Sequence, residues 1–149
     1  MPQHTETKKL PYSAEQMYDL VADVGSYPEF LPWTAAARIR STDDRGETIL
    51  MLADLVISFK VFRERFGSRV TLWQDKSRID TEYIDGPFRY LESRWDFKQV
   101  EGGCEVTFFV DFEFKNRILQ GAAGMFFNEA MQRIVRAFER RAADLYQGA

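Results

Sequence analysis

Residues 91–112, LESRWDFKQVEGGCEVTFFVDF, decide the fold. Two runs of alternating apolar and polar residues flank Glu101-Gly102, a pattern typical of a β-hairpin. A two-residue turn there sets Lys98 opposite Glu105 on one face. On the other face it brings together three apolar pairs, namely Phe97 with Val106, Trp95 with Phe108 and Leu91 with Phe112. The hairpin is therefore predicted to have one buried face and one face in water.

The same pairing arithmetic extends the sheet towards the N-terminus. Residues 33–114 are predicted to form six strands, with turn signals at 43–46, 74–77, 85–87 and 101–103. The loop at 74–77 sets Leu72 opposite Ile79, and a three-residue turn at 85–87 is predicted to set Thr81 opposite Leu91. One face stays largely apolar across consecutive strands, which indicates an antiparallel meander.

Helices are predicted on either side of this meander. Ser13 and Gln16 have the spacing of a capping box, so a helix is expected from there to Gly25. A short second helix before Pro28 and a strand at about 4–11 complete the N-terminal part. Asn116 can cap a long helix over 116–147. The apolar stripe of that helix comprises Leu119, Ala123, Phe127, Ala130, Met131, Ile134, Phe138, Ala142 and Leu145.

These elements predict an α+β fold in a single domain over residues 1–149. A curved seven-stranded antiparallel sheet is expected to wrap around the long C-terminal helix, because each has one apolar face that the other can cover. A single helix about 10–12 Å wide is too narrow to fill a wide curved sheet. We therefore expect an elongated internal apolar cavity, closed by the short helices and the loop that follows them.

Composition excludes several chemistries. Cys104 is the only cysteine, and His4, the only histidine, is expected in a frayed N-terminus. No disulfide, His-based triad or cysteine zinc site is therefore expected, and the site should need no metal and no catalytic residue. The net charge of −3 provides no global attraction for DNA. No leader peptide or bilayer-spanning run is evident, so a soluble cytoplasmic protein is expected.

Several long stretches, in order, resemble one known family. The chain is similar to the coenzyme Q-binding family of the START-like, or polyketide cyclase-like, helix-grip superfamily, from about Tyr12 to Tyr146. That family includes mitochondrial ubiquinone-binding proteins and a bacterial branch of ribosome-association toxins. Thr34 departs from the family pattern, where a cysteine is more usual. The stretches that carry the resemblance are YSAEQMYDLVADVGSYPEFLPW (12–33), FKVFRERFGSRVTL (59–72), DGPFRYLESRWDF (85–97), FEFKN (112–116) and AFERRAADLY (137–146).

The resemblance implies a carrier or chaperone for ubiquinone that supports respiratory electron transport, with no chemical step. It also implies transient contact with a membrane surface, and so a cytoplasmic protein that is peripheral at the inner membrane. The residue pattern agrees on an apolar ligand, because the chain lacks a Gly-rich phosphate loop and metal-ligand clusters. Residues expected to line the cavity, each of which also suits ordinary core packing, are Phe62, Phe66, Trp95, Phe97, Phe108, Phe112, Phe127, Met131 and Ile134.

Two segments have more than one interpretation. The stretch YPEFLPW (27–33) combines two prolines with large apolar groups, so it is either a fixed core plug or a lid that touches the membrane. Its lid residues would be Tyr27, Phe30, Leu31 and Trp33. The stretch GAAGMFF (121–127) is interpreted as close packing around small residues or, alternatively, as a flexible portal.

Two other functions stay open. The first is binding to the large ribosomal subunit, as in the toxin branch of the family, through arginines that make the last helix locally basic: Arg133, Arg136, Arg140 and Arg141. The second is a cyclase-like enzyme, which would need inward titratable groups. The candidates for such groups, Tyr83 and Asp54, are scattered along the sequence.

Overall fold

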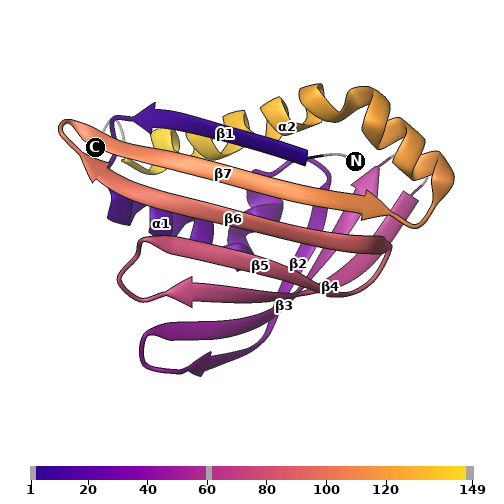
Figure 1. Cartoon of the computed structure of the whole chain (residues 1–149), viewed down its shortest axis with the longest axis horizontal. Coiled ribbons are helices and arrows are strands. Elements are labelled where there is room, and N and C mark those ends of the chain that lie inside the picture. The colour runs from indigo at the N-terminus through magenta and orange to yellow at the C-terminus, as the bar shows by residue number, and fades with distance from the viewer. Residues whose placement is uncertain (1–2, 60–61, 147–149) are drawn as a thin grey trace.

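The computed structural model describes residues 3–59 and 62–146. It confirms the predicted α+β architecture, a curved antiparallel sheet that holds a long C-terminal helix (Figure 1). The elements are β1 (Gln3–Leu10), α1 (Ala14–Ala22), the 3₁₀ helix η1 (Val24–Glu29), β2 (Thr34–Asp44), β3 (Thr48–Phe59), β4 (Phe62–Trp73), β5 (Arg78–Asp85), β6 (Phe88–Val100), β7 (Gly103–Phe114) and α2 (Arg117–Tyr146).

The seven strands lie in the order β1-β7-β6-β5-β4-β3-β2, so the meander from β2 to β7 is confirmed and β1 pairs with its last strand. Trp95 lies opposite Phe108, as the hairpin arithmetic predicts. Leu72 lies opposite Ile79, again as predicted. Because apolar residues meet in register, one face of the sheet is apolar from strand to strand.

The predicted register between β5 and β6 is wrong by two residues. Thr81 lies opposite Ser93 rather than Leu91, and the pairing ends at Glu82 with Glu92. The β5–β6 pairing stops before the turn, and both neighbouring ladders contain register shifts near it, so the strand ends are irregular where the prediction assumed a tight turn. Gly86 in this turn has a φ of +137° and lies against Phe66, a conformation that only glycine adopts readily.

The N-terminal elements close the sheet edge and one end of the core. The Ser13 hydroxyl accepts from the Gln16 amide, and the Gln16 side chain accepts from the Ser13 amide, each at 3.0 Å. The predicted capping box is therefore confirmed. The expectation that His4 lies in a frayed end is wrong, because β1 pairs along β7 with His4 opposite Val110.

Helix α2 packs against the inner face of the sheet and runs along β1 and β7 (Figure 1). The Asn116 side chain caps it by accepting from the amides of Ile118 and Leu119 at 2.8 and 3.0 Å. Most of the predicted stripe faces the core, but Leu145 is 49% exposed. The helix is kinked at Phe126, whose φ of −111° and ψ of 16° are not helical. The buried members of the stripe and its neighbours are Leu119, Met131, Val135, Phe138 and Ala142.

Candidate ligand-binding site and its entrance

Eight of the nine predicted cavity residues come together on the inner face of the sheet and on α2, whereas Phe62 lies outside this cluster, opposite Phe59 at the start of β4. The Trp95 ring lies 4.4 Å from that of Phe108 and 4.9 Å from that of Phe138, measured between ring centroids. Phe112 lies 5.7 Å from Phe127. Phe62, Phe127 and Ile134 are half-buried. The remaining predicted residues are buried, namely Phe66, Trp95, Phe97, Phe108, Phe112 and Met131.

These side chains fill most of the space in which the sequence predicts an elongated cavity. A cavity of ≈ 20 Å³ lies between β1, β6, β7, α1 and α2, room for about one water molecule. Trp95 and Phe108 are the predicted residues that line it. Its other lining residues are Glu6, Lys8, Leu10, Met17, Val106, Val135, Phe138 and Glu139.

Charged residues form one wall of this cavity, which the sequence analysis missed. The Lys8 ammonium lies 2.9 Å from a Glu139 carboxylate oxygen, and Glu6 lies 3.3 Å from His4. The hydrogen bond to Glu139 raises the pKa of Lys8. The signal in the sequence was the alternation in β1, where every second residue from His4 faces inward.

Hydroxyl groups occupy the middle of the inner face, on β4, β5 and β6. Ser68 is 2% exposed and donates to the Ala53 carbonyl at 3.3 Å. Thr81 and Ser93 lie opposite each other on the same face as Val70 and Val110. Such groups can donate to the carbonyl oxygen of a ligand or accept from its hydroxyl.

The lid residues separate into two groups. Tyr27 and Phe30 pack edge-on against Phe138 of α2, with ring centroids 5.6 and 5.3 Å away. The Tyr27 hydroxyl donates to the Val21 carbonyl, and burial raises the pKa of that phenol, so it stays a protonated donor at neutral pH. Leu31 is half-buried against the same core. This part of the segment is held in place on α2.

Trp33 lies elsewhere, beside the end of β3. Its carbonyl accepts from the Ser58 amide at 2.8 Å, and its ring lies 6.1 Å from that of Phe59. Its φ of 60° is in the left-handed region, which is uncommon for a non-glycine residue. Phe59 pairs with Phe62, so Trp33 belongs to an aromatic group at the end of the β3–β4 hairpin.

The part of α2 up to its kink, residues 117–126 (hereafter its first half), is not closely packed on its outer side. Gly121 and Gly124 have open space where a Cβ would lie. Met125 is 78% exposed and Phe126 48%. Packing around small residues, the favoured interpretation of GAAGMFF, is therefore wrong for this outer side.

Other chemistries find little support in the part of the chain that the structure describes. No cluster of three His, Cys, Asp or Glu side chains there could hold a metal ion. Asp54 lies 2.7 Å from Arg65 on one face, whereas Tyr83 pairs across from Ser68 on the other. These two candidates for acid–base chemistry therefore do not face each other.

Burial raises the pKa of the Cys104 thiol. Among the described helices, none combines the length and apolarity that crossing a membrane requires.

A curved sheet that grips a long C-terminal helix over an apolar inner face defines a START-like helix-grip domain. The chain belongs to the family described as polyketide cyclase/dehydrase and lipid transport, whose sequence profile matches residues 10–139.

Individual relatives carry two different names. The chain is 41% identical to the ribosome association toxin RatA of Rickettsia prowazekii, over 93% of this chain and 94% of the relative. It is 34% identical to the mitochondrial coenzyme Q-binding protein COQ10 homolog B of Xenopus laevis, over 97% of this chain and 59% of the relative. A solution structure of an 18 kDa protein from Caulobacter crescentus matches with a TM-score of 0.81 and 33% identity, covering 100% of both chains.

Proposed function

We propose that the chain binds an isoprenoid quinone, ubiquinone, between α2 and the sheet, and carries it in support of respiratory electron transport without a chemical step. The observation that carries the proposal is the apolar inner face, which continues from β3 to β7 and onto α2. The name of the coenzyme Q-binding relative supports the choice of quinone.

The energetics suit a ligand held by area rather than by many polar contacts. Burial of apolar surface contributes about 25 cal/mol per Å². Several hundred Å² of isoprenoid tail would therefore outweigh head-group hydrogen bonds of about 1 kcal/mol each. Thr81 and Ser93, in the middle of the inner face, are the groups that we expect to meet the quinone carbonyls.

A quinone requires more room than the ≈ 20 Å³ cavity provides. The segment best placed to move is the first half of α2, because its outer side has no packing partner around Gly121 and Gly124. Its inner side contributes Leu119, which is buried, and it leads into the half-buried Phe127. Outward movement of this half would uncover the aromatic cluster of β6 and β7. Trp33 and Phe59, at the end of the β3–β4 hairpin, are the residues that we expect to form the lid over the ligand.

The experiment compares two adjacent phenylalanines. Phe127→Asp places a carboxylate against Phe112, whereas Phe126→Asp places it on the exposed outer side. The protein, purified from a quinone-making host and then offered ubiquinone in detergent solution without a bilayer, is extracted with organic solvent and analysed by mass spectrometry. The wild type and Phe126→Asp are expected to carry ubiquinone, and Phe127→Asp to carry less, because a desolvated carboxylate costs several kcal/mol or must take up a proton.

Folding of each variant is checked by circular dichroism and thermal melting. Wild-type protein that carries no isoprenoid quinone, and takes none up from detergent solution, would overturn the proposal. Equal quinone content in the two folded variants would place the ligand elsewhere.

A second candidate function is binding to the large ribosomal subunit, which we propose on one observation. A surface groove of ≈ 420 Å³ lies between the end of β1 and α2 and contains Arg136 and Arg140. The names of the toxin relatives support this alternative. Arg141, also predicted to take part, is instead 3.2 Å from Glu29. RNA phosphates would bind this groove in a salt-dependent way.

Co-sedimentation with large subunits tests this alternative. Binding is expected at low salt and should be lost in Arg136→Glu/Arg140→Glu, whereas Arg45→Glu/Arg69→Glu, on the opposite part of the sheet, should retain it. Binding that ignores both salt and the groove variants would exclude an arginine-driven contact with RNA.

A further inference from the structure

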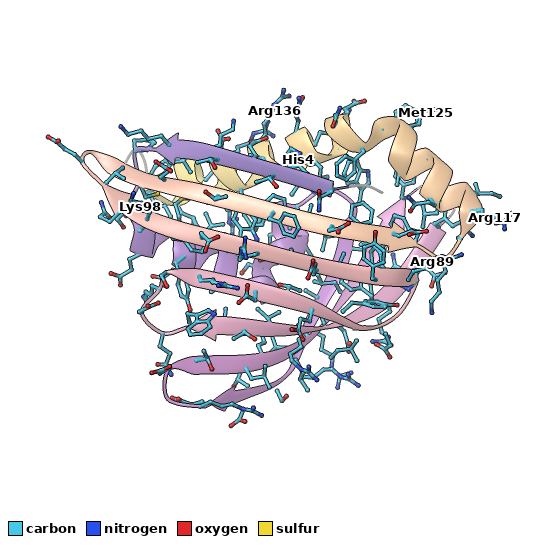
Figure 2. The ribbon with its side chains drawn as sticks, in the orientation of Figure 1. His4, Arg89, Lys98, Arg117, Met125 and Arg136 are labelled. Carbon is cyan, nitrogen blue, oxygen red and sulfur yellow. The ribbon has the colours of Figure 1, made fainter. Side chains whose placement is uncertain are left out.

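We propose that the first half of α2 is a membrane-docking surface that inserts apolar side chains into a bilayer containing anionic lipid. The inference deepens the proposed function by naming the surface that would meet the membrane. Three large apolar side chains project from this short segment into water: Ile118 is 74% exposed, Met125 78% and Phe126 48%. Figure 2 shows Met125 and Arg117 on α2 at one end of the molecule.

The first half of α2 is apolar on both sides. Leu119 and Ala123, four residues apart, lie on the side that faces the core. Ile118 and Met125, seven residues apart, lie on one outer face of the helix. A helix that is apolar all round is expected to be buried in a core or in a membrane, not to be half in water.

Charge around this patch favours an anionic surface. Between Phe114 and Asn128 the chain contains two cations, Lys115 and Arg117, and no acidic residue. Both cations are exposed. Basic residues beside an inserted apolar face add affinity for anionic lipid, at about 1 kcal/mol per residue near the membrane surface. Arg89, which Figure 2 shows at the same end, is paired with Glu113 at 3.5 Å and contributes less.

The kink at Phe126 confines the apolar surface to one end of the helix. Beyond it the outer side is polar, and Arg133 pairs with Glu129 at 3.1 Å. A docked protein would therefore insert the first half and keep the second half in water. This arrangement matches an interfacial helix, whose apolar side chains are buried by about 5–10 Å.

A bilayer suits this patch better than a second protein molecule. Stable protein interfaces bury about 800 Å² on each partner, far more than three side chains on about two and a half helical turns provide. The side chains project from a convex helix that has no neighbour beside Gly121 and Gly124, so there is no groove for a partner to fill. Lipid requires no matching shape, because side chains insert one by one.

The test is flotation of the purified protein with vesicles of phosphatidylcholine, alone or mixed with phosphatidylglycerol. The docking variant is Ile118→Ser/Met125→Ser/Phe126→Ser. The chain offers a matched control in three other exposed apolar residues, Ile39→Ser/Ile84→Ser/Leu145→Ser, which are 37, 42 and 49% exposed. The docking variant is expected to lose about tenfold or more of its vesicle binding, while the control binds like the wild type. Lys115→Gln/Arg117→Gln should lose the preference for phosphatidylglycerol.

Three outcomes would overturn the inference: no vesicle binding by the wild type, equal loss in the docking and control variants, or a wild-type dimer that the docking variant converts to a monomer. Circular dichroism and melting temperature should be the same for both triple variants, since all six side chains are exposed. Failure here is distinguishable from failure of quinone binding. Vesicle flotation is measured without quinone, and quinone uptake from detergent solution is measured without a bilayer.

Discussion

The two halves of α2 have the same secondary structure but different surroundings. In the second half, Phe138 packs among Trp95, Tyr27 and Phe30, while Arg133 faces water. In the first half, Leu119 faces the core, but Met125 on the outer side is 78% exposed. One half is a conventional amphipathic helix, and the other presents apolar groups to both sides.

The difference separates stability from function within one helix. Stability in a helix comes mostly from packing of its buried face, and the second half has the denser packing. The first half contains two glycines, each of which weakens a helix by about 1 kcal/mol relative to alanine. A segment that must open for a ligand is expected to have a low free energy of local unfolding. The predictions below test this division.

The largest expected effect is that of removing Phe138. Phe138→Ala should lower the free energy of unfolding by about 3–5 kcal/mol, as for other buried phenylalanines, because it leaves a cavity among three aromatic rings. Phe126→Ala, in the first half, should change the same quantity by less than about 0.5 kcal/mol. Urea unfolding followed by circular dichroism measures both. Similar losses in the two variants would contradict the comparison.

Smaller effects are expected from the lid segment, in which Phe30 packs on α2 and Trp33 lies beside the end of β3. Phe30→Ser should cost about 2 kcal/mol, less than a full core truncation because Phe30 is half-buried. Trp33→Ser, beside Phe59, should alter the rate of quinone transfer between liposomes more than it alters stability. Melting temperature and a liposome transfer assay, applied to each single variant, distinguish a plug from a lid. If Phe30→Ser leaves stability unchanged and speeds transfer, then Tyr27 and Phe30 also belong to the lid.

The fold was largely predictable because its signals are local and repeated. Trp95 and Phe108 were placed opposite each other from one short turn, and the Asn116 cap fixed where α2 begins. The β5–β6 register was not predictable, since the strands are irregular beside Gly86, which has a φ of +137° and lies against Phe66.

The candidate site was predictable in its chemistry but not in its volume. Periodicity placed Phe112 and Phe127 on facing surfaces, and they do meet. Whether such side chains leave a cavity depends on rotamers and curvature, which periodicity does not encode. The exposed apolar patch on the outer side of α2 was not predicted either. Met125 and Phe126 adjoin the inward Phe127 in sequence, so they were grouped with the apolar residues of the core.

Adding side chains at the two glycines should stiffen the first half of α2. Gly121→Ala/Gly124→Ala should stabilise it by about 1 kcal/mol per residue, since both positions have open space and helical backbone. Hydrogen exchange of the 117–126 amides should slow. If this half must move to admit quinone, uptake should slow as well. Gly25→Ala, another glycine with open space, is the control outside α2 and should change neither rate. Faster uptake in the double variant would show that another segment opens.

The smallest expected effect concerns the ion pair that connects the second half of α2 to the end of η1. Arg141 lies 3.2 Å from Glu29 and 5.2 Å from the centre of the Phe30 ring, and its side chain is 23% exposed. An exposed pair contributes about 0–1 kcal/mol, and a cation over an aromatic ring adds about 0.5–1 kcal/mol. Arg141→Gln should therefore cost about 1 kcal/mol, and a double-mutant cycle with Glu29→Gln should assign less than half of that to the ion pair. The pair of Arg133 with Glu129, which touches no ring, is the comparison within the same half of the helix. Equal costs for Arg141→Gln and Arg133→Gln would mean that the ring contact contributes nothing, and that Phe30 stays on α2 through its packing with Phe138 alone.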